Sequence, residues 1–234
     1  MVQTPIQPEL KTQYPDSDGK PMADNTEQYQ WITRLVTNLK HLLKDQDAFV
    51  AGDLLWYPVQ VEKDETPPSQ APDAMVAFGR PKGARGSYRQ WEEGGIAPQV
   101  VFEVLSPSNT RKEMAQKQKF YEDYGVLESY YYDPQRRDFW GYVRESADEV
   151  CTLITALYLP WTSSLLGIRF ELFDDGLAVF HPNGKPFKDP EAFALGEEAA
   201  QAERDEAKAE RDELQAQLDA ALAKLKELGV DGYP

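Results

Sequence analysis

One acidic residue interrupts the most apolar strand-like segment of the chain. In the segment QVVFEVLS (99–106), Glu103 stands between Phe102 and Val104. Such a run is typical of a strand that is buried on both faces of a sheet. A buried carboxylate costs several kcal/mol of folding free energy unless a cation, a metal ion or a proton compensates its charge. The segment therefore predicts a covered central sheet in which one charged position has a partner.

Helix-like and strand-like patterns alternate along the rest of the chain. Apolar positions recur at helical spacing from Thr26 to about Lys44. A second helix begins after a cap at Asn109 or Thr110 and ends at Gly125. The expected strands are residues 48–59, 73–79, 99–106, 128–133, 138–144, about 150–158, 168–173 and 177–180. This order predicts an α/β or α+β fold with a mixed central β-sheet flanked by helices.

Composition divides the chain into three parts. Residues 1–25 are polar and contain four prolines, which is typical of an irregular N-terminal arm. Residues 26–190 contain the helix and strand patterns and form the expected globular domain. Residues 191–234 carry twelve acidic and five basic residues and form the expected C-terminal helical extension.

The extension contains a sevenfold repeat. Four consecutive blocks, AERDEAK, AERDELQ, AQLDAAL and AKLKELG, make up residues 202–229. Alanine begins each block, and leucine or alanine fills most of the third and sixth places, which predicts a long helix with heptad character. Arg204 and Arg211 fall in the seam of the first half, so the pattern is strongest near the C-terminus. We expect a homodimer through this helix; a solvated helix that packs back on the core is the alternative.

Charge and cysteine content limit the class of protein. The formal net charge of −15 disfavours a protein that coats nucleic acid non-specifically, but it allows a local basic groove. The single cysteine, Cys151, cannot form an internal disulfide. The chain contains only two histidines, His41 and His181, so a zinc site is not expected. No stretch approaches the length of a membrane span, and the first 30 residues lack a secretory pattern. We therefore expect a cytoplasmic protein with no membrane partner.

A second carboxylate stands at the start of another strand-like segment. Asp73 follows Pro72 and opens the apolar run DAMVAFG. If the two strands are neighbours, Asp73 and Glu103 lie close together, and two like charges at short range need a divalent cation between them. Oxygen ligands favour Mg²⁺ or Mn²⁺ over zinc. The alternatives are a turn-type aspartate after proline and a glutamate on an edge strand that faces water.

Four segments follow one another in a characteristic order and spacing: PD at 72–73, VVFEVLSPSNTRKE, KQKFY with a later GV, and ESYYYDP. Together they resemble the putative restriction endonuclease family, a domain common in photosynthetic bacteria that belongs to the PD-(D/E)XK nuclease superfamily. The resemblance covers about residues 20–190, and EVLSPS is its most specific motif. It implies a restriction-endonuclease-like core and Mg²⁺-dependent (or Mn²⁺-dependent) hydrolysis of DNA.

The superfamily pattern implies a role for the two carboxylates. Asp73 and Glu103 would hold the metal ion together with the backbone carbonyl of Val104. The ion would polarise the scissile phosphate and lower the pKa of a bound water. Glu27, at the start of the first helix, is a further candidate because related nucleases often supply a carboxylate from that helix. A favourable charge at a helix N-terminus is the alternative for Glu27.

The chain departs from the superfamily pattern at Leu105, where a lysine normally stands two residues after the glutamate. The resemblance implies that Lys117 supplies the ammonium instead, and that Tyr121, one helical turn later on the same face, is a further candidate catalytic residue. Glu113, four residues before Lys117, could pair with it. Lys119 lies on a different helical face and is the natural negative control. If Leu105 leaves the site without its lysine, the fold is kept and catalysis is lost.

A basic segment follows the strand that Asp73 opens. Four basic residues fall within ten positions that contain no acidic residue: Arg80, Lys82, Arg85 and Arg89. This pattern is typical of a loop that tracks phosphates, and Arg111 and Lys112 extend the expected DNA contact; a solvated insertion is the alternative. The sequence thus predicts a Mg²⁺-dependent endonuclease acting on DNA. The alternative is a catalytically inactive nuclease-fold binding or scaffold module that acts through its C-terminal helix.

Overall fold

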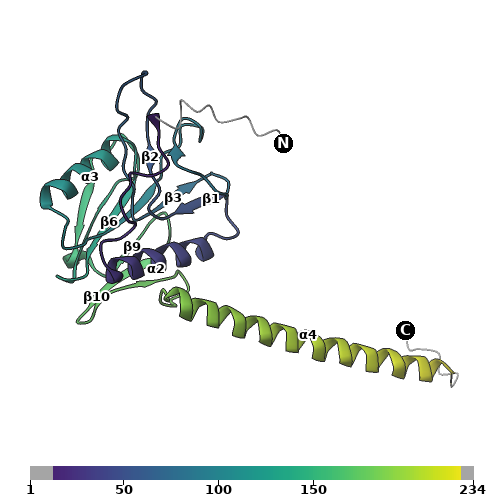
Figure 1. Cartoon of the computed structure of the whole chain (residues 1–234). Helices are drawn as coiled ribbons and strands as arrows, with labels where there is room; N and C mark the ends of the chain where they lie inside the picture. The colour runs from purple at the N-terminus through teal and green to yellow at the C-terminus, as the bar shows by residue number, and fades with distance from the viewer. Residues whose placement is uncertain (1–12, 228–234) are drawn as a thin grey trace. The chain divides into compact units, whose positions relative to one another are not determined.

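The computed structural model describes residues 13–227. Its centre is a six-stranded sheet in the order β1-β3-β5-β6-β7-β8 (Figure 1). Strands β5 and β6 are parallel and the other neighbouring pairs are antiparallel, so the sheet is mixed, as the sequence predicts. The six strands are β1 (Ala48–Ala51), β3 (Ala74–Phe78), β5 (Val100–Val104), β6 (Glu128–Asp133), β7 (Asp138–Val143) and β8 (Thr152–Thr155).

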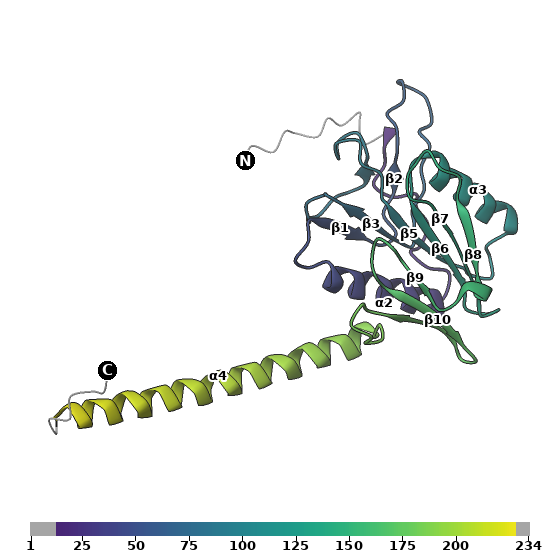
Figure 2. The ribbon, with the colours of Figure 1, turned by 180° about the vertical axis from the view of Figure 1, so that it is seen from behind.

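Two small sheets and the helices α2 and α3 lie around this sheet (Figure 2). The small sheets consist of the parallel pair β2 (Trp56–Tyr57) and β4 (Tyr88–Arg89), and of β9 (Trp161–Thr162), β10 (Arg169–Phe173) and β11 (Gly176–Phe180). The helices are α2 (Thr26–Leu42), α3 (Arg111–Asp123), the 3₁₀ helix η1 (Ala156–Tyr158) and α4 (Pro190–Glu227).

Helices α2 and α3 contribute to separate hydrophobic clusters. Leu35 of α2 belongs to the cluster that contains Val104 of β5. Tyr121 of α3 belongs to the cluster that contains Val101. Because successive side chains of a strand point to opposite faces, Glu103 shares the α3 face with Val101. The charged position of β5 is therefore covered by α3.

Two predicted strands are shorter in the structure. Residues 48–59 are not one strand: β1 ends at Ala51, and Asp53 adopts a left-handed backbone with φ of 48°. This conformation is uncommon for a residue other than glycine, and it turns the chain so that β2 joins a different sheet. Within residues 150–158, the strand β8 is followed by η1. The apolar pattern marks these segments as buried or extended but does not reveal the turns.

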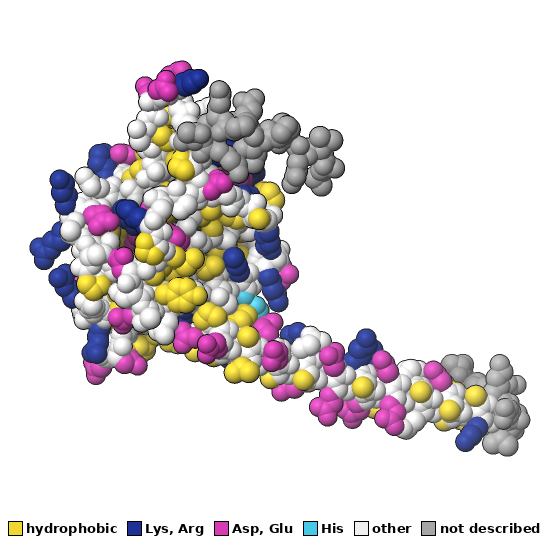
Figure 3. Space-filling model, viewed as in Figure 1, with side chains coloured by type: hydrophobic (Ala, Val, Ile, Leu, Met, Phe, Trp, Pro, Cys, Tyr) yellow, Lys and Arg dark blue, Asp and Glu magenta, His cyan; other side chains and the backbone are white. Residues whose placement is uncertain are grey.

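The chain divides into two compact units, residues 1–187 and 188–234. In the second unit α4 is 38 residues long, and hydrophobic side chains are spaced along it between acidic ones (Figure 3). Its exposed leucines are Leu195, Leu214, Leu218, Leu222 and Leu225. None of the helices described has the length and hydropathy of a transmembrane segment. Residues 1–12 of the predicted arm and 228–234 of the predicted extension lie outside the described residues.

Candidate active site

The buried carboxylate of Glu103 receives two side-chain contacts from α3. Glu103 is 3% exposed on β5. The ammonium of Lys117 donates to its Oε2 at 2.7 Å, and the hydroxyl of Tyr121 donates to its Oε1. Lys117 and Tyr121 are four residues apart, so their side chains share one face of the helix. The acidic residue of the apolar strand thus has the cationic partner that its burial requires.

A capping box fixes where α3 begins. The Thr110 hydroxyl accepts a hydrogen bond from the backbone N–H of Glu113, and the Glu113 carboxylate accepts one from the backbone N–H of Thr110. This arrangement starts the helix at Arg111 and sets the direction in which Lys117 points. Glu113 forms this box rather than the expected ion pair with Lys117, although its charge contributes to raising the pKa of that lysine.

Asp73 lies beside Glu103 because β3 and β5 are antiparallel neighbours. The register pairs Ala74 with Phe102, and the next position along both strands brings Asp73 opposite Glu103. Asp73 is 7% exposed, and its Oδ2 accepts a hydrogen bond from the backbone N–H of Val104 at 2.6 Å. The structure therefore places the two predicted carboxylates side by side.

An amide side chain from α2 contacts the same strand end. The Nε2 of Gln28 donates to the Val104 carbonyl at 2.9 Å, and its Oε1 accepts from the backbone N–H of Asp24 at 2.8 Å. Gln28 is buried, and it is not among the site residues that the sequence predicts. A polar residue on the apolar side of an amphipathic helix was the available signal. Through Gln28, α2 is tied to the end of β5.

Burial and neighbouring charges set the protonation states of the group. Burial and the charge of Glu103 raise the pKa of Asp73 well above its ordinary value. Burial lowers the pKa of Lys117, but the carboxylates of Glu103 and Asp73 raise it more, so the net pKa is raised. Burial and Glu103 also raise the pKa of Tyr121 well above its ordinary value. At neutral pH Lys117 is therefore an ammonium and Tyr121 a neutral hydroxyl donor.

A third carboxylate, Asp53, follows β1 near this pair. Its backbone N–H donates to the carbonyl of Pro72 at 3.0 Å, so the turn after β1 runs beside the start of β3. Burial and the charge of Asp18 raise the pKa of Asp53, and Lys117 acts in the opposite direction. The sequence gives no signal for Asp53, because the apolar pattern of residues 48–59 predicts a continuous strand at this position.

The structure does not bring Glu27 to this group. Glu27 is exposed in the first turn of α2, and its charge acts on Tyr132. The neighbouring Gln28 is the α2 residue that reaches the site. Lys119 is 75% exposed and pairs with Asp123 at 2.8 Å, on a different face of α3 from Lys117, as the helical spacing predicts.

The predicted basic loop makes mainly internal contacts. Arg85 forms an ion pair with Glu93 and lies over the ring of Phe49 at 3.9 Å. Arg89 is 7% exposed and donates to the carbonyl of Tyr14 at 3.3 Å. Both guanidinium groups are thus engaged within the fold.

The other predicted DNA-contact residues differ in exposure. Arg80 is half-buried and donates to the carbonyl of Gly79, whereas Lys82 is exposed and donates to the carbonyl of Lys44. Arg111 and Lys112 are exposed at the start of α3. The six basic residues therefore do not form one continuous exposed track.

The oxygen donors of the site fit a hydrated Mg²⁺ or Mn²⁺ ion. Mg²⁺ is commonly held by one or two carboxylates and keeps several water ligands. Asp73 and Glu103 supply two carboxylates, and the Val104 carbonyl, which accepts the hydrogen bond from Gln28 and has a second lone pair, lies at the same strand end. Across residues 13–227, no three histidine, cysteine, aspartate or glutamate side chains are grouped so that they could hold a metal ion. Water molecules would have to complete the coordination.

A family model described as Uma2, putative restriction endonuclease, matches residues 2–179 of the chain. The chain belongs to the Uma2 family. The match confirms the family that the sequence motifs resemble, and it includes every residue of the site described above. Membership of this family supports a nuclease-like function.

A crystal structure of a putative nuclease belonging to DUF820 from Anabaena variabilis is also similar to this Uma2 protein. The two chains are 16% identical, and the match covers 57% of this chain and 69% of the other with a TM-score of 0.42. No curated protein matches the chain. The family and the mixed sheet between helices agree with the fold class that the sequence predicts.

Proposed function

We propose that this Uma2 protein is an endonuclease that hydrolyses DNA phosphodiester bonds with Mg²⁺ or Mn²⁺. The observation that supports the proposal is the convergence of Asp73, Glu103 and Lys117 from two neighbouring strands and one helix. Two carboxylates that hold a divalent ion, together with an ammonium, are groups that promote phosphodiester hydrolysis.

The proposed metal ligands are Asp73, Glu103 and the backbone carbonyl of Val104. A bound ion supplies the charge that polarises the scissile phosphate and lowers the pKa of its water ligand. The hydrogen bond from the Val104 N–H to Asp73 Oδ2 orients one carboxylate, and the Tyr121 hydroxyl orients the other. Both ligands are thereby held in fixed directions before substrate arrives.

Lys117 acts in this proposal as a cation rather than as a general base. Its pKa is raised by the two carboxylates, so it does not offer a free amine to accept a proton. Its positive charge stabilises the negative charge that develops on the phosphate in the transition state. Leu105, at the usual lysine position, packs with the α3 cluster. Lys117 therefore supplies the positive charge that Leu105 cannot.

Cleavage of supercoiled plasmid DNA in Mg²⁺ tests the proposal. Asp73→Asn, Glu103→Gln and Lys117→Ala are each expected to lower the cleavage rate by about 100-fold or more, because each removes a charge from the reacting centre. Lys119→Ala is the matched control and keeps the wild-type rate, since Lys119 is exposed on another face of α3. An equal loss in all four folded variants contradicts the assigned roles.

A second candidate function is a catalytically inactive binding or scaffold module that acts through α4. The exposed leucines of α4 and the leucine at position 105 favour it. Titration calorimetry with Mg²⁺ separates the two candidates. The endonuclease binds the ion with a heat that Asp73→Asn abolishes, whereas the inactive module gives no metal-binding heat in either protein.

We also propose that α4 joins two copies of the chain in a homodimer. The second half of α4 exposes leucines at positions that recur along the helix, and exposed leucines at heptad spacing pack against a partner helix. A dimer supplies two cutting centres, one for each strand of a DNA duplex.

A further inference from the structure

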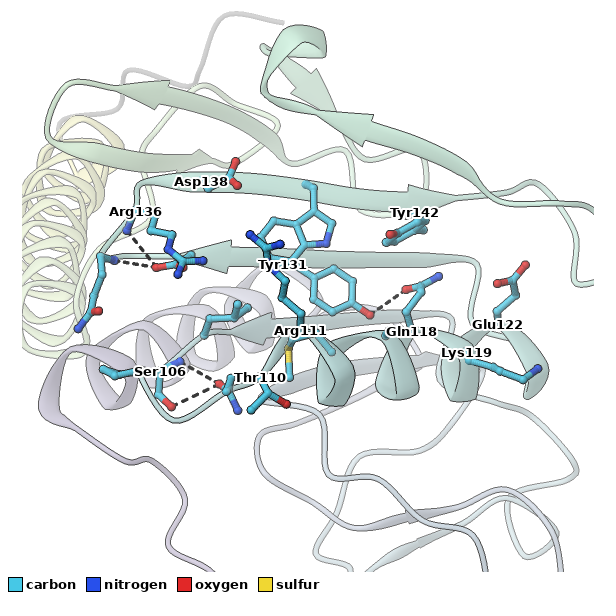
Figure 4. Close-up of a pocket in the computed structure, with 18 of the residues that line it drawn as sticks. Ser106, Thr110, Arg111, Gln118, Lys119, Glu122, Tyr131, Arg136, Asp138 and Tyr142 are labelled. Carbon is cyan, nitrogen blue, oxygen red and sulfur yellow. Dashed lines mark hydrogen bonds and ion pairs between the residues drawn. The ribbon is translucent and has the colours of Figure 1, made fainter.

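A groove of about 820 Å³ lies between α3 and strands β6 and β7 (Figure 4). The strands contribute Tyr131, Trp140 and Tyr142 to its lining, and α3 contributes Arg111 and Gln118. Lys117 and Tyr121 are not among the lining residues because they point from α3 toward Glu103. The groove is therefore separate from the catalytic group, although one helix borders both.

The side-chain amide of Gln118 has a fixed orientation in this groove. Its Oε1 accepts hydrogen bonds from the Ser129 hydroxyl at 2.9 Å and from the Tyr131 hydroxyl at 2.8 Å. These bonds use both lone pairs of the oxygen, so the Nε2 group turns toward the space between Tyr142 and Glu122 (Figure 4). Within residues 13–227, this Nε2 donates to no protein acceptor. Gln118 therefore presents two unused N–H donors to the groove.

Aromatic rings form the sheet side of the groove. Tyr131 and Trp140 are cross-strand neighbours whose rings stack with centroids 5.3 Å apart and planes 4° apart. Tyr142 lies two residues along β7 on the same face, with its ring at 89° to that of Tyr131. Trp140 and Tyr142 are only partly buried. Partly open aromatic rings of this kind are the surfaces on which flat rings stack.

The charges of the groove are mostly paired with one another. Lys119 pairs with Asp123, and Arg136 pairs with Asp133. Arg111 is exposed and forms no ion pair with the described part of the chain. The groove therefore offers a cation at the end where α3 begins.

Glu122 gives the groove an acceptor beside the Gln118 donors (Figure 4). An adjacent donor and acceptor match a ring edge that carries a ring nitrogen next to an exocyclic amino group. Adenine and cytosine carry this donor–acceptor pair on their Watson–Crick edge, whereas guanine presents two N–H donors there and thymine has no amino group. The chemistry of the groove thus favours an amino-bearing base.

We propose that this groove binds one unpaired adenine or cytosine base of a nucleic-acid strand. The ring stacks on Tyr142 and meets Trp140, whose plane is nearly perpendicular to that of Tyr142, edge to face. The polar edge of the base contacts Gln118 and Glu122, and a flanking phosphate contacts Arg111. The inference rests on the proposed function for nucleic acid as the ligand class, and it adds an unpaired base to the substrate. Only an unpaired base can present this edge together with a ring face to the protein.

Fluorescence polarisation of the full chain with fluorescein-labelled single-stranded hexadeoxyadenylate, in EDTA, tests the proposal. Gln118→Glu keeps the oxygen that holds Ser129 and Tyr131 but removes both donors, and Tyr142→Ala removes a stacking surface. Each is expected to weaken binding by about tenfold. Gln116→Glu is the matched control: Gln116 is exposed on the same helix and does not line the groove, so its affinity is unchanged. The wild-type chain is expected to bind hexathymidylate more weakly than hexadeoxyadenylate, because thymine has no amino group to donate to Glu122.

Three results overturn the proposal: no binding of the hexadeoxyadenylate by the wild-type chain, equal affinity of Gln118→Glu and Gln116→Glu, or tighter binding of the same sequence as a duplex. If Gln118→Glu lowers the melting temperature, the affinity of Tyr142→Ala relative to wild type becomes the test, and an unchanged affinity of that variant overturns the proposal. Because EDTA removes metal ions, the measurement is independent of cleavage. A chain that binds the oligonucleotide through Gln118 but cuts no DNA retains the base site and disproves the proposed endonuclease.

Discussion

A single buried charge determines much of the chemistry around it. Glu103 is held by an ammonium and a hydroxyl from α3, and the carboxylate of Asp73 lies opposite it. The single ammonium balances only one of the two negative charges. Burial and the charge of Glu103 therefore still raise the pKa of Asp73. Two carboxylates facing one ammonium leave the group acidic, which is the condition that the proposed divalent cation would satisfy.

Removing the ammonium is expected to destabilise the metal-free protein. Lys117→Met leaves the Glu103 carboxylate buried without a cation, and breaking such a pair typically costs roughly 3 kcal/mol. Lys119→Met, at an exposed position, changes stability by less than about 0.5 kcal/mol. Urea unfolding in EDTA measures both. Equal unfolding midpoints for the two variants would show that the Lys117–Glu103 contact contributes no stability.

His181 gives a second residue-scale prediction, on pH. Burial lowers its pKa below the usual 6.5, with smaller contributions from His41 and Lys185, while its ring contacts the Asn38 side chain at 3.1 Å. The unfolded chain therefore binds a proton more readily than the folded one. The stability that His181 contributes is present above pH 6.5 and is lost as the pH falls through 6.5 toward the folded pKa.

Melting temperatures from pH 7.5 to 5.5 check this sign. The wild-type protein is expected to lose more stability on acidification than His181→Gln, whose side chain does not titrate. Parallel curves for the two proteins would contradict the assignment. Comparing the two proteins cancels the titration of Asp73 and other carboxylates, which is common to both.

At the scale of elements, strand β6 is anchored at its first residue. Glu128 is 1% exposed and accepts hydrogen bonds from the Tyr130 and Ser163 hydroxyls, from both the backbone and the hydroxyl of Ser164, and from the backbone of Leu165. These bonds tie the central sheet to the segment that leads into β10. Glu128 is thus a structural carboxylate, in contrast to the pair at the candidate site.

Glu128→Ala is expected to lower the free energy of unfolding by about 3 kcal/mol or more, because it leaves several buried donors without an acceptor. Glu145→Ala, at an exposed position, serves as the control and stays within about 0.5 kcal/mol of wild type. Chemical denaturation followed by circular dichroism measures both. A small effect at Glu128 would mean that water replaces the lost acceptor.

The sequence was informative where one residue contradicted its local pattern. Glu103 is an acid in an apolar strand, so its need for a compensating partner was predictable, and the family resemblance singled out Lys117 of the following helix as the ammonium of the site. Asp53 depends on a left-handed turn that no short-range pattern indicates. The contacts of Arg85 and Arg89 depend on tertiary neighbours, so a count of basic residues gave no information about their availability.

For the whole molecule, the division into residues 1–187 and 188–234 separates the candidate site from the heptad helix. The globular unit contains the site and its supporting contacts, and α4 presents leucines to solvent. The proposed DNA cleavage by the globular unit and the proposed dimerisation through α4 can therefore be tested in separate experiments.

Deleting residues 188–234 tests the dimer. Light scattering after size-exclusion chromatography is expected to give the mass of two chains for the full protein and of one chain for the truncated form, because the leucine-bearing helix is lost. The truncated form should retain the circular dichroism of a folded mixed sheet. An unchanged oligomeric state after the deletion would remove α4 as the interface.

The Lys117–Glu103 contact also has a consequence for assembly of the active form. A site whose negative charge is already partly balanced by a residue of its own chain does not require an external ion in order to adopt its shape. In small zinc domains, by contrast, the metal and the fold arise in a single event. Under the proposed metal-dependent hydrolysis, the polypeptide would fold first and bind the ion afterwards, so a chelator would abolish the activity reversibly and leave the fold intact.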